Sequence, residues 1–354
     1  MVCYLICTFL HLGVFSSSAW SFVRTPDVRT SDQVPAEHKL EVITTFSVIA
    51  DMVRAVAGDL ATVKSIVPPG VDVHRYHLTP SDLYKARDAN LILLNGLNLE
   101  LWFTKFFSRL GDIPTVVVSD GISLVDMTDG PRVSSHPDHS PTSYCERIEC
   151  SEERECKVMK VEAYKECMDK IQHNNSLVKV PNPHAWVSPM AALVYINNIR
   201  DALVKYDPAN AEKYEENAEE YKDRIARLII SLSSSIRDLP PEKRWIVTSE
   251  AAFSYLARDF GLKELYLWPV NNDQIGTPGQ VRTMIDKVRN HGIKVIFSES
   301  TVSPRPAQMI ARDTMARYGG ILYADSLSND RGPVPTYLDL LEVTAFTLAR
   351  ELSR

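Results

Sequence analysis

The segment RWIVTSEAAFSYLARDFG, from Arg244 to Gly261, joins a strand pattern to a helix pattern within one short stretch. Its apolar start, Trp245 to Val247, predicts the end of a strand, and Ala251 to Phe260 predicts a helix. Glu250 lies where one gives way to the other. A carboxylate at this junction is either a first-turn residue favoured by the helix dipole or a ligand, and the segment as a whole predicts one β–α unit.

The same alternation recurs on both sides of this segment. LEVITT, TVKSIVPPG, NLILLNG and PTVVVSDG alternate with helical patterns after Leu40, and RWIVTSE, ELYLWPV, IKVIFSES and GGILYADSL do so after Pro240. This repetition predicts an α/β fold with two lobes, each built on a mainly parallel sheet. A chain of 354 residues is long enough for two such domains with a cleft between them.

One long amphipathic helix is expected to join the lobes. Asp207 and Pro208 supply an N-cap and a proline at the first helical position, and Pro240 ends the pattern. A coiled-coil dimerisation helix is the alternative, but the apolar seam is short, and we expect a monomer. The residues that make the seam follow a spacing of three or four: Tyr214, Ala218, Tyr221, Ile225, Leu228, Leu232 and Ile236.

The first residues, MVCYLICTFLHLGVFSSSAWS, have the pattern of a secretory signal. An apolar run, Val2–Phe15, precedes small residues, with Ser17 and Ala19 flanking a cleavage point, so we predict a signal peptide over 1–19. The run lacks Lys and Arg, which leaves a wrongly chosen start codon or a buried helix as alternatives. Cys7 precedes any complete apolar run, so lipid attachment is not convincing. We therefore predict four parts: a signal peptide (1–19), a first lobe (39–207), a linking helix (208–238) and a second lobe (239–354).

The charge balance excludes one class of partner. The chain has 39 Lys and Arg against 45 Asp and Glu, a net charge of -6, so we expect no nucleic-acid partner. A cationic partner is permitted. After the N-terminal segment, no apolar run approaches the length of a membrane helix.

A stretch rich in Ser, Pro and charged residues interrupts the first lobe from Gly130 to Asn182. We predict a surface excursion over about 130–182. None of its cysteine gaps is Cys-x-x-Cys, and an exported protein favours disulfides over the alternative, a zinc knot. The pairing stays open among its four cysteines: Cys145, Cys150, Cys156 and Cys167.

Candidate ligands follow the predicted strands, because ligands of open parallel sheets collect beyond the carboxyl ends of the strands. His74 and His77 follow one strand, Glu250 and Asp325 follow two others, and His184 lies in a loop just ahead of a helix. Each has an ordinary alternative, such as a turn residue, a helix cap or a structural histidine. Two histidines and two carboxylates together can surround a divalent cation.

These residues lie in motifs that resemble a known family. In chain order, the motifs are TTFSVIADMVRAVAGD, GVDVHRYHLTPSD, LILLNGLNLE, PHAWVSP, VTSEAAFSYLARDFGL, LWPVNNDQIGTPGQV, VIFSES and LYADSLS. They look like the metal-binding solute receptors of ABC importers, also called the manganese and zinc adhesin-lipoprotein family. The resemblance covers nearly all of Leu40 to Arg354. It implies two α/β lobes joined by one long helix, a metal ion in the cleft, a periplasmic location and an ABC permease of the inner membrane as partner.

The resemblance implies four metal ligands. The family's first histidine falls on His74, which makes His77 a bystander, and its second falls on His184. The third and fourth ligands fall on Glu250 in TSEAAFSY and Asp325 in YADSLS. Residues that match around the two histidines are Tyr76, Pro80, Asp82, Trp186 and Pro189. Residues that depart from the pattern are Val73 and Leu78 where proline is usual, and Asn182 where aspartate is usual.

The ligand types favour a manganese or iron receptor. Relatives that carry zinc usually have histidine at the position of Glu250, whereas two imidazoles with two carboxylates suit Mn²⁺ or Fe²⁺ better. The expected function is therefore capture of Mn²⁺ or Fe²⁺ for a permease, without catalysis. The alternatives are a zinc receptor of the same family, a metalloenzyme with an open coordination position, and a surface adhesin that uses the cysteine-bearing excursion.

Overall fold

The structure, a computed structural model, describes residues 39–100, 103, 106, 110, 113–127, 180–270 and 276–354. The predicted signal peptide, the four cysteines of the excursion and most of that segment lie outside the described residues. Lys39–Arg354 form one compact unit. None of the helices in the described ranges is both long and apolar enough to cross a membrane.

The first lobe contains a four-stranded parallel sheet with the strand order β2-β1-β3-β4. Every residue of β3 is buried, which agrees with the continuous apolar run LILL of a strand covered on both faces. The strands are β1 (Leu40–Phe46), β2 (Ala61–Val67), β3 (Leu91–Leu94) and β4 (Thr115–Val117). The helices that follow β1 and β2 are α1 (Ser47–Ala57) and α2 (Pro80–Ala86).

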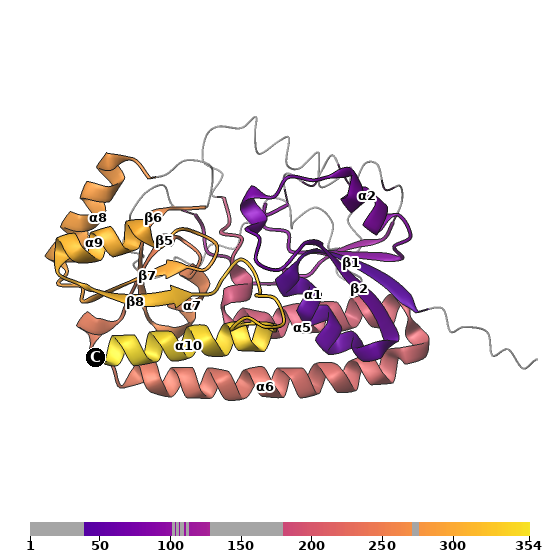
Figure 1. Cartoon of the computed structure of the whole chain (residues 1–354). Helices are drawn as coiled ribbons and strands as arrows, with labels where there is room; N and C mark the ends of the chain where they lie inside the picture. The colour runs from indigo at the N-terminus through magenta and orange to yellow at the C-terminus, as the bar shows by residue number, and fades with distance from the viewer. Residues whose placement is uncertain are drawn as a thin grey trace, which may run out of the picture. The chain divides into compact units, whose positions relative to one another are not determined.

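The second lobe contains two parallel strand pairs, β5 with β6 and β7 with β8. Strands β5 and β7 contact each other, so the two pairs lie side by side (Figure 1). The strands are β5 (Trp245–Glu250), β6 (Lys263–Trp268), β7 (Val295–Glu299) and β8 (Arg317–Leu322). The helices among them are α7 (Ser254–Phe260), α8 (Pro278–Asn290) and α9 (Arg305–Thr314). The parallel α/β architecture predicted from the sequence is confirmed.

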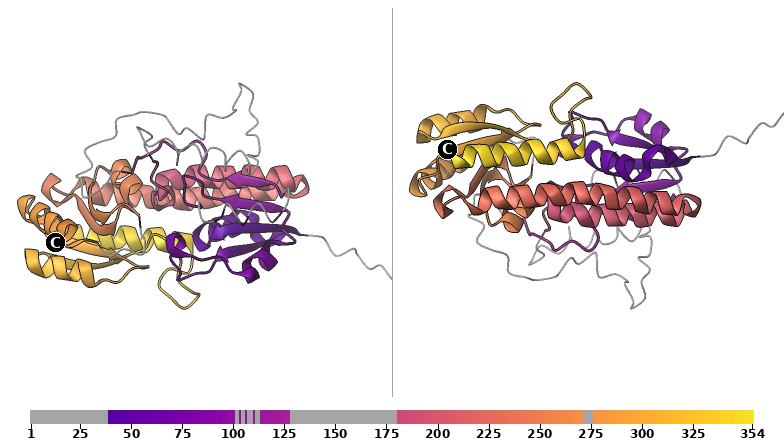
Figure 2. Two further views of the ribbon diagram at one scale, coloured as in Figure 1. Left: turned by 90° about the horizontal axis from the view of Figure 1, so that it is seen from above. Right: turned by 90° about the horizontal axis from the view of Figure 1, so that it is seen from below.

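A long helix, α6 (Ala211–Arg237), runs along both lobes, as Figures 1 and 2 show. Its 27 residues reach about 40 Å at 1.5 Å per residue. It contacts α1 of the first lobe and two other long helices, α5 (Pro189–Tyr206) and α10 (Tyr337–Ser353). Six of the seven predicted seam residues are buried: Tyr214, Ala218, Tyr221, Ile225, Leu232 and Ile236.

The start of α6 differs from the prediction. Pro208–Asn210 form a separate 3-10 turn, and the α-helix begins at Ala211. The Asp207 carboxylate caps no backbone N–H; it accepts hydrogen bonds from the Tyr214 hydroxyl at 2.5 Å and the Asn210 side chain at 2.8 Å. Asp207 and Pro208 therefore take the predicted N-cap and first positions, but of the 3-10 turn rather than of the α-helix, and the Asp207 carboxylate binds side-chain donors instead of a backbone N–H.

Residues 180–182, at the end of the segment predicted as an excursion, pair with the chain that precedes it. Asn182 is buried, with 1% of its surface exposed, and its backbone N–H donates to the Val125 carbonyl. The Met127 N–H donates to the Val180 carbonyl, and Asp126 and Pro181 form an antiparallel bridge. Residues 180–182 therefore pair with 125–127 inside the fold, a backbone contact that a Pro-containing polar stretch does not reveal in sequence.

The two lobes share a hydrophobic core. One cluster of buried side chains includes Val42 and Ile49 of the first lobe, Ile246 and Leu322 of the second, and Tyr214 of the long helix. Because the packing is continuous from lobe to lobe, it fixes the ends of β5 and β8 opposite the loops of the first lobe. Short 3-10 helices complete the connections: η1 (Gly58–Leu60), η2 (Val73–Arg75), η4 (Ala185–Val187), η5 (Pro208–Asn210) and η6 (Pro241–Lys243).

Candidate metal centre

Four side chains from four separate elements meet at one point between the lobes. His74 lies in η2, and His184 immediately precedes η4. Glu250 is the last residue of β5, and Asp325 lies three residues after β8. Each offers one nitrogen or oxygen atom, and these four atoms all lie within 4.8 Å of one another. The structure thus brings together the four residues singled out in the sequence as candidate ligands.

The atoms are close enough to face a single ion. The Nε2 atoms of His74 and His184 are 2.9 Å apart. Glu250 Oε1 lies 3.5 Å from His184 Nε2 and 3.7 Å from His74 Nε2, and Asp325 Oδ1 lies 3.5 Å and 3.9 Å from the same two atoms. The side chain of His74 is 5% exposed and the other three are 0% exposed. The cluster is therefore enclosed by protein.

Burial sets the protonation of this cluster. It lowers the pKa of His74 well below its usual value, and the neighbouring His184 lowers it further. Burial also lowers the pKa of His184, although the charges of Asp325 and Asp72 act in the opposite direction and raise it. Burial and the charge of Glu250 raise the pKa of Asp325 well above its usual range. Neutral imidazoles beside crowded carboxyl groups form a set that could hold a divalent cation, which would relieve the repulsion between the acids.

Local hydrogen bonds aim His74 inward. The Asp72 carboxylate accepts from the His74 backbone N–H at 2.8 Å, which closes the turn that begins η2. The Asp82 carboxylate then accepts from the Tyr76 hydroxyl at 2.9 Å and from the Thr79 backbone, so the loop is tied to the start of α2. His77, three residues after His74, is exposed. The fold therefore separates the two histidines that compete in the sequence.

His184 is held by the residue two positions before it. Asn182 Oδ1 accepts from the His184 backbone N–H at 2.9 Å and lies 2.7 Å from His184 Nδ1. On the other side, the indole of Trp186 donates to the Ala324 carbonyl at 2.9 Å, next to Asp325. These bonds tie the loop of the first lobe to the segment after β8, so His184 and Asp325 are positioned together.

Glu250 belongs to the strand rather than to the helix. β5 extends through Glu250 and α7 begins only at Ser254, so the first-turn alternative is wrong, as is the predicted helix start at Ala251. The Glu250 backbone N–H donates to Glu299 Oε1 at 2.6 Å. The sequence reasoning missed Glu299, although VIFSES places it at the end of a strand just as TSEAAF places Glu250.

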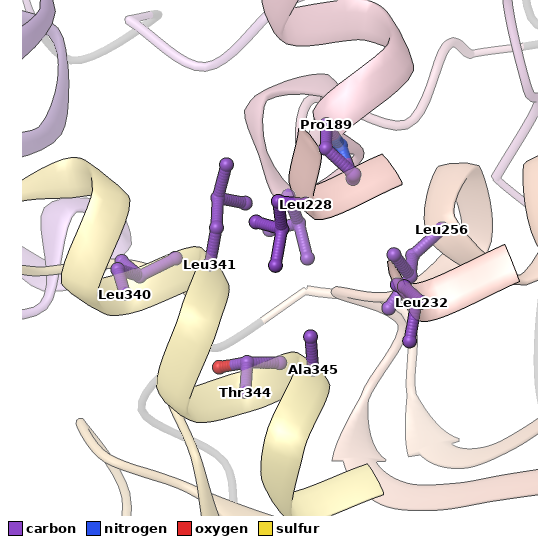
Figure 3. A pocket seen from close by; sticks show the side chains of 9 residues that line it. Pro189, Leu228, Leu232, Leu256, Leu340, Leu341, Thr344 and Ala345 are labelled. Carbon is purple, nitrogen blue, oxygen red and sulfur yellow. The ribbon is translucent and has the colours of Figure 1, made fainter. Parts of the chain in front are cut away.

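A small cavity lies elsewhere, between the first turn of α5 and helices α6, α7 and α10 (Figure 3). Its walls are almost entirely aliphatic and offer no ligand to a metal ion. The hydroxyl of Thr344, its one polar side-chain group, is bonded to the backbone of Tyr323. The lining residues are Val187, Pro189, Leu228, Leu232, Leu256, Leu340, Leu341, Thr344 and Ala345. A metal ion would therefore find donor atoms in the enclosed cluster and none in the aliphatic lining of this cavity.

Comparisons with known proteins identify the family of this chain. The family model described as "Zinc-uptake complex component A periplasmic" matches residues 42–351. Iron-binding protein YfeA of Yersinia pestis is 42% identical over 330 residues, 93% of this chain and 92% of YfeA. Manganese ABC transporter substrate-binding lipoprotein PsaA of Streptococcus pneumoniae is 29% identical over 323 residues, 89% of this chain and 90% of PsaA. The solved structure of a Mn-bound periplasmic metal binding protein from Candidatus Liberibacter asiaticus is 40% identical, with a TM-score of 0.71 over 89% of this chain and 100% of that one. The chain therefore belongs to the family of the periplasmic zinc-uptake component A, the metal-binding substrate-binding proteins of ABC transporters.

Proposed function

We propose that this protein captures Mn²⁺ or Fe²⁺ in the periplasm through His74, His184, Glu250 and Asp325, and delivers the ion to an ABC permease. The observation that carries the proposal is the meeting of two imidazoles and two carboxylates within 4.8 Å in an enclosed site. Burying two acids in one place is costly unless a cation is present. A divalent ion would neutralise both carboxylates and use both imidazole lone pairs.

The choice of metal rests on the donor set. Oxygen donors favour the higher coordination numbers that Mn²⁺ accepts, whereas Zn²⁺ tolerates tetrahedral nitrogen donors. Relatives described as iron-binding and as manganese transport proteins support this assignment. Zinc is the second candidate, because the matching family model is described as a zinc-uptake component and mixed nitrogen and oxygen sites follow the Irving–Williams order.

Binding is favoured over catalysis by the enclosure of the cluster. A metalloenzyme needs an open coordination position and a substrate pocket beside the metal. Here the four side chains are 0–5% exposed, and the cavity of Figure 3 is lined by other residues. The adhesin alternative depends on the cysteine-bearing excursion, most of which lies outside the described residues.

Metal analysis of the protein purified from its native compartment tests the cargo directly. We expect one equivalent of manganese or iron for each chain. A full equivalent of zinc, with neither of the other metals present, would contradict the manganese or iron assignment and favour the zinc receptor.

A pair of histidine variants tests the site. His74→Ala removes an enclosed ligand, and we expect the Mn²⁺ affinity to fall by more than the ~10–100-fold typical of residues that only support a ligand. His77→Ala is the matched control, since His77 is an exposed histidine of the same loop. The Mn²⁺ affinity of this variant should equal that of the wild type. Isothermal titration calorimetry measures both affinities. The reverse ranking would show that the site is built on the other histidine.

A further inference from the structure

A row of hydrogen bonds leads from His184 to another buried carboxylate, that of Glu264. His184 Nδ1 lies 2.7 Å from Asn182 Oδ1, and Asn182 Nδ2 donates to Ser254 Oγ at 3.1 Å. Ser254 Oγ donates to Glu264 Oε2 at 2.5 Å. Glu264 lies in β6, Ser254 begins α7, and all four residues are buried. We call these residues the His184 relay.

The amide of Asn182 can adopt only one orientation. Its Nδ2 lies 2.7 Å from the Ala251 carbonyl, which can only accept, and its Oδ1 lies 2.9 Å from the His184 backbone N–H, which can only donate. An exchange of the two amide atoms would place acceptor against acceptor and donor against donor. The orientation therefore follows from hydrogen-bond chemistry alone.

The direction of the remaining bonds follows from the two ends. Asn182 Oδ1 can only accept, so His184 Nδ1 carries the proton and donates it. At the other end, the Ser254 hydroxyl has two acceptors in reach, Glu264 Oε2 at 2.5 Å and the Ala251 carbonyl at 3.4 Å. Its single hydrogen goes to the nearer one, Glu264 Oε2, which leaves an oxygen lone pair of Ser254 for Asn182 Nδ2. Hydrogen bonds aligned in one direction polarise one another, and here they end on Glu264, whose carboxyl group is ionised above about pH 7 because burial raises its pKa to about 7.

We propose that Glu264 is a positioning residue that acts through Ser254 and Asn182 to hold His184 as the Nδ1–H tautomer and to polarise its ring. The Nε2 lone pair then faces Glu250 Oε1 and Asp325 Oδ1, both 3.5 Å away. The tautomer follows from the hydrogen bonds, whereas the effect on metal binding rests on the proposed function. A partner at the second ring nitrogen of a metal-binding histidine fixes its orientation and raises its basicity.

Glu264 also has a structural contact, because its Oε1 accepts from the Phe253 backbone N–H at 2.9 Å. A variant of Glu264 alone would not separate the two roles. A double-mutant cycle with Asn182 separates them, because Asn182→Ala breaks the relay between Ser254 and His184 and leaves the Phe253 contact in place.

Titration with Mn²⁺ alone gives the first readout. We expect Asn182→Ala to lower the affinity ~10–100-fold, and Glu264→Gln, which acts two bonds farther away, to lower it about threefold to tenfold. In the Asn182→Ala background, Glu264→Gln should have no further effect. Ser254→Ala, which leaves the carboxylate in place, should reproduce the loss caused by Glu264→Gln. Glu351→Gln is the matched control, because Glu351 is likewise a buried glutamate, but its carboxylate accepts from Arg317, Arg350 and Arg354 near the end of α10 instead.

The ring nitrogens give a second readout that needs no metal. Long-range ¹H–¹⁵N NMR spectra of the metal-free protein should show His184 as a single Nδ1–H tautomer. The Nδ1 shift should change in Glu264→Gln and not in Glu351→Gln. Equal losses of affinity from Glu264→Gln in both backgrounds, or an Nε2–H tautomer in the wild type, would overturn the relay. A wild type that binds none of the three metals but shows these ring signals would overturn the proposed function and support the relay.

Discussion

Glu100 offers a quantitative test of how this fold handles buried acids. It is 0% exposed, and its carboxylate accepts hydrogen bonds from the Asn95 and Gly96 backbone and from the Thr45 hydroxyl. Burial nevertheless raises its pKa to about 7 from an ordinary 4.5. Asn95 in turn donates to the Pro183 carbonyl, next to His184, so this carboxylate also braces the loop of a candidate ligand. Replacement by Gln removes the titration and keeps the shape.

The sign and the size follow from linkage. A pKa that is higher in the folded state gives stability that is complete below pH 4.5 and is lost as the pH rises through about 7. The difference between those values, at about 1.4 kcal/mol for each pH unit, gives about 3 kcal/mol. The free energy of unfolding of Glu100→Gln, minus that of the wild type, should therefore rise by about 3 kcal/mol between about pH 4.5 and about pH 8.

Urea denaturation of both proteins at the two pH values, with a chelator to remove bound ions, measures this difference. Burial also raises the pKa values of Glu264 and Glu299 to about 7, but both residues are present in the two proteins, so their effects cancel. A difference that stays constant with pH would refute the reasoning. It would mean that the three hydrogen bonds outweigh burial and that Glu100 stays ionised throughout.

Two further predictions concern selectivity and the excursion. Glu250→His should raise the dissociation constant for Mn²⁺ by a larger factor than that for Zn²⁺, because it creates a site with three imidazoles; an unchanged ratio of the two constants would remove Glu250 as the source of the preference. Mass spectrometry of the exported protein should find no free thiol among four cysteines that form two disulfides, each adding about 2 to 4 kcal/mol of stability; four free thiols would contradict this and favour a zinc knot. These cysteines are Cys145, Cys150, Cys156 and Cys167.

The strands were predictable because buried parallel strands have a local signature. β3 is a continuous apolar run, and β5, which the segment RWIVTSE predicts, is buried along its whole length. Helix starts were less predictable. Asp207 and Ala251 each lie three residues or more before the α-helix that they were expected to begin. The exact start of a helix depends on hydrogen bonds from nearby side chains and turns, and the spacing of apolar residues does not describe those bonds.

The candidate ligands were predictable for two different reasons. Glu250 and Asp325 follow apolar strands, where the geometry of a parallel sheet gathers side chains. His74 was distinguished from His77 by resemblance alone, since the sequence spacing favours neither. The structure supplies the physical distinction, because the bonds of Asp72 and Asp82 turn His74 inward and leave His77 exposed.

The sequence by itself determined the alternation of strands and helices, the long linking helix and the residue types that can bind a divalent ion. These depend on side-chain chemistry and on periods of a few residues. Only the tertiary structure decided that His74 and His184, 110 positions apart, lie 2.9 Å from each other. It also decided that hydrogen bonds connect Asn182 to Ser254 and Ser254 to Glu264. Distances and pKa values of this kind depend on which surfaces the shared core removes from water, and that is a property of the packed chain rather than of any segment.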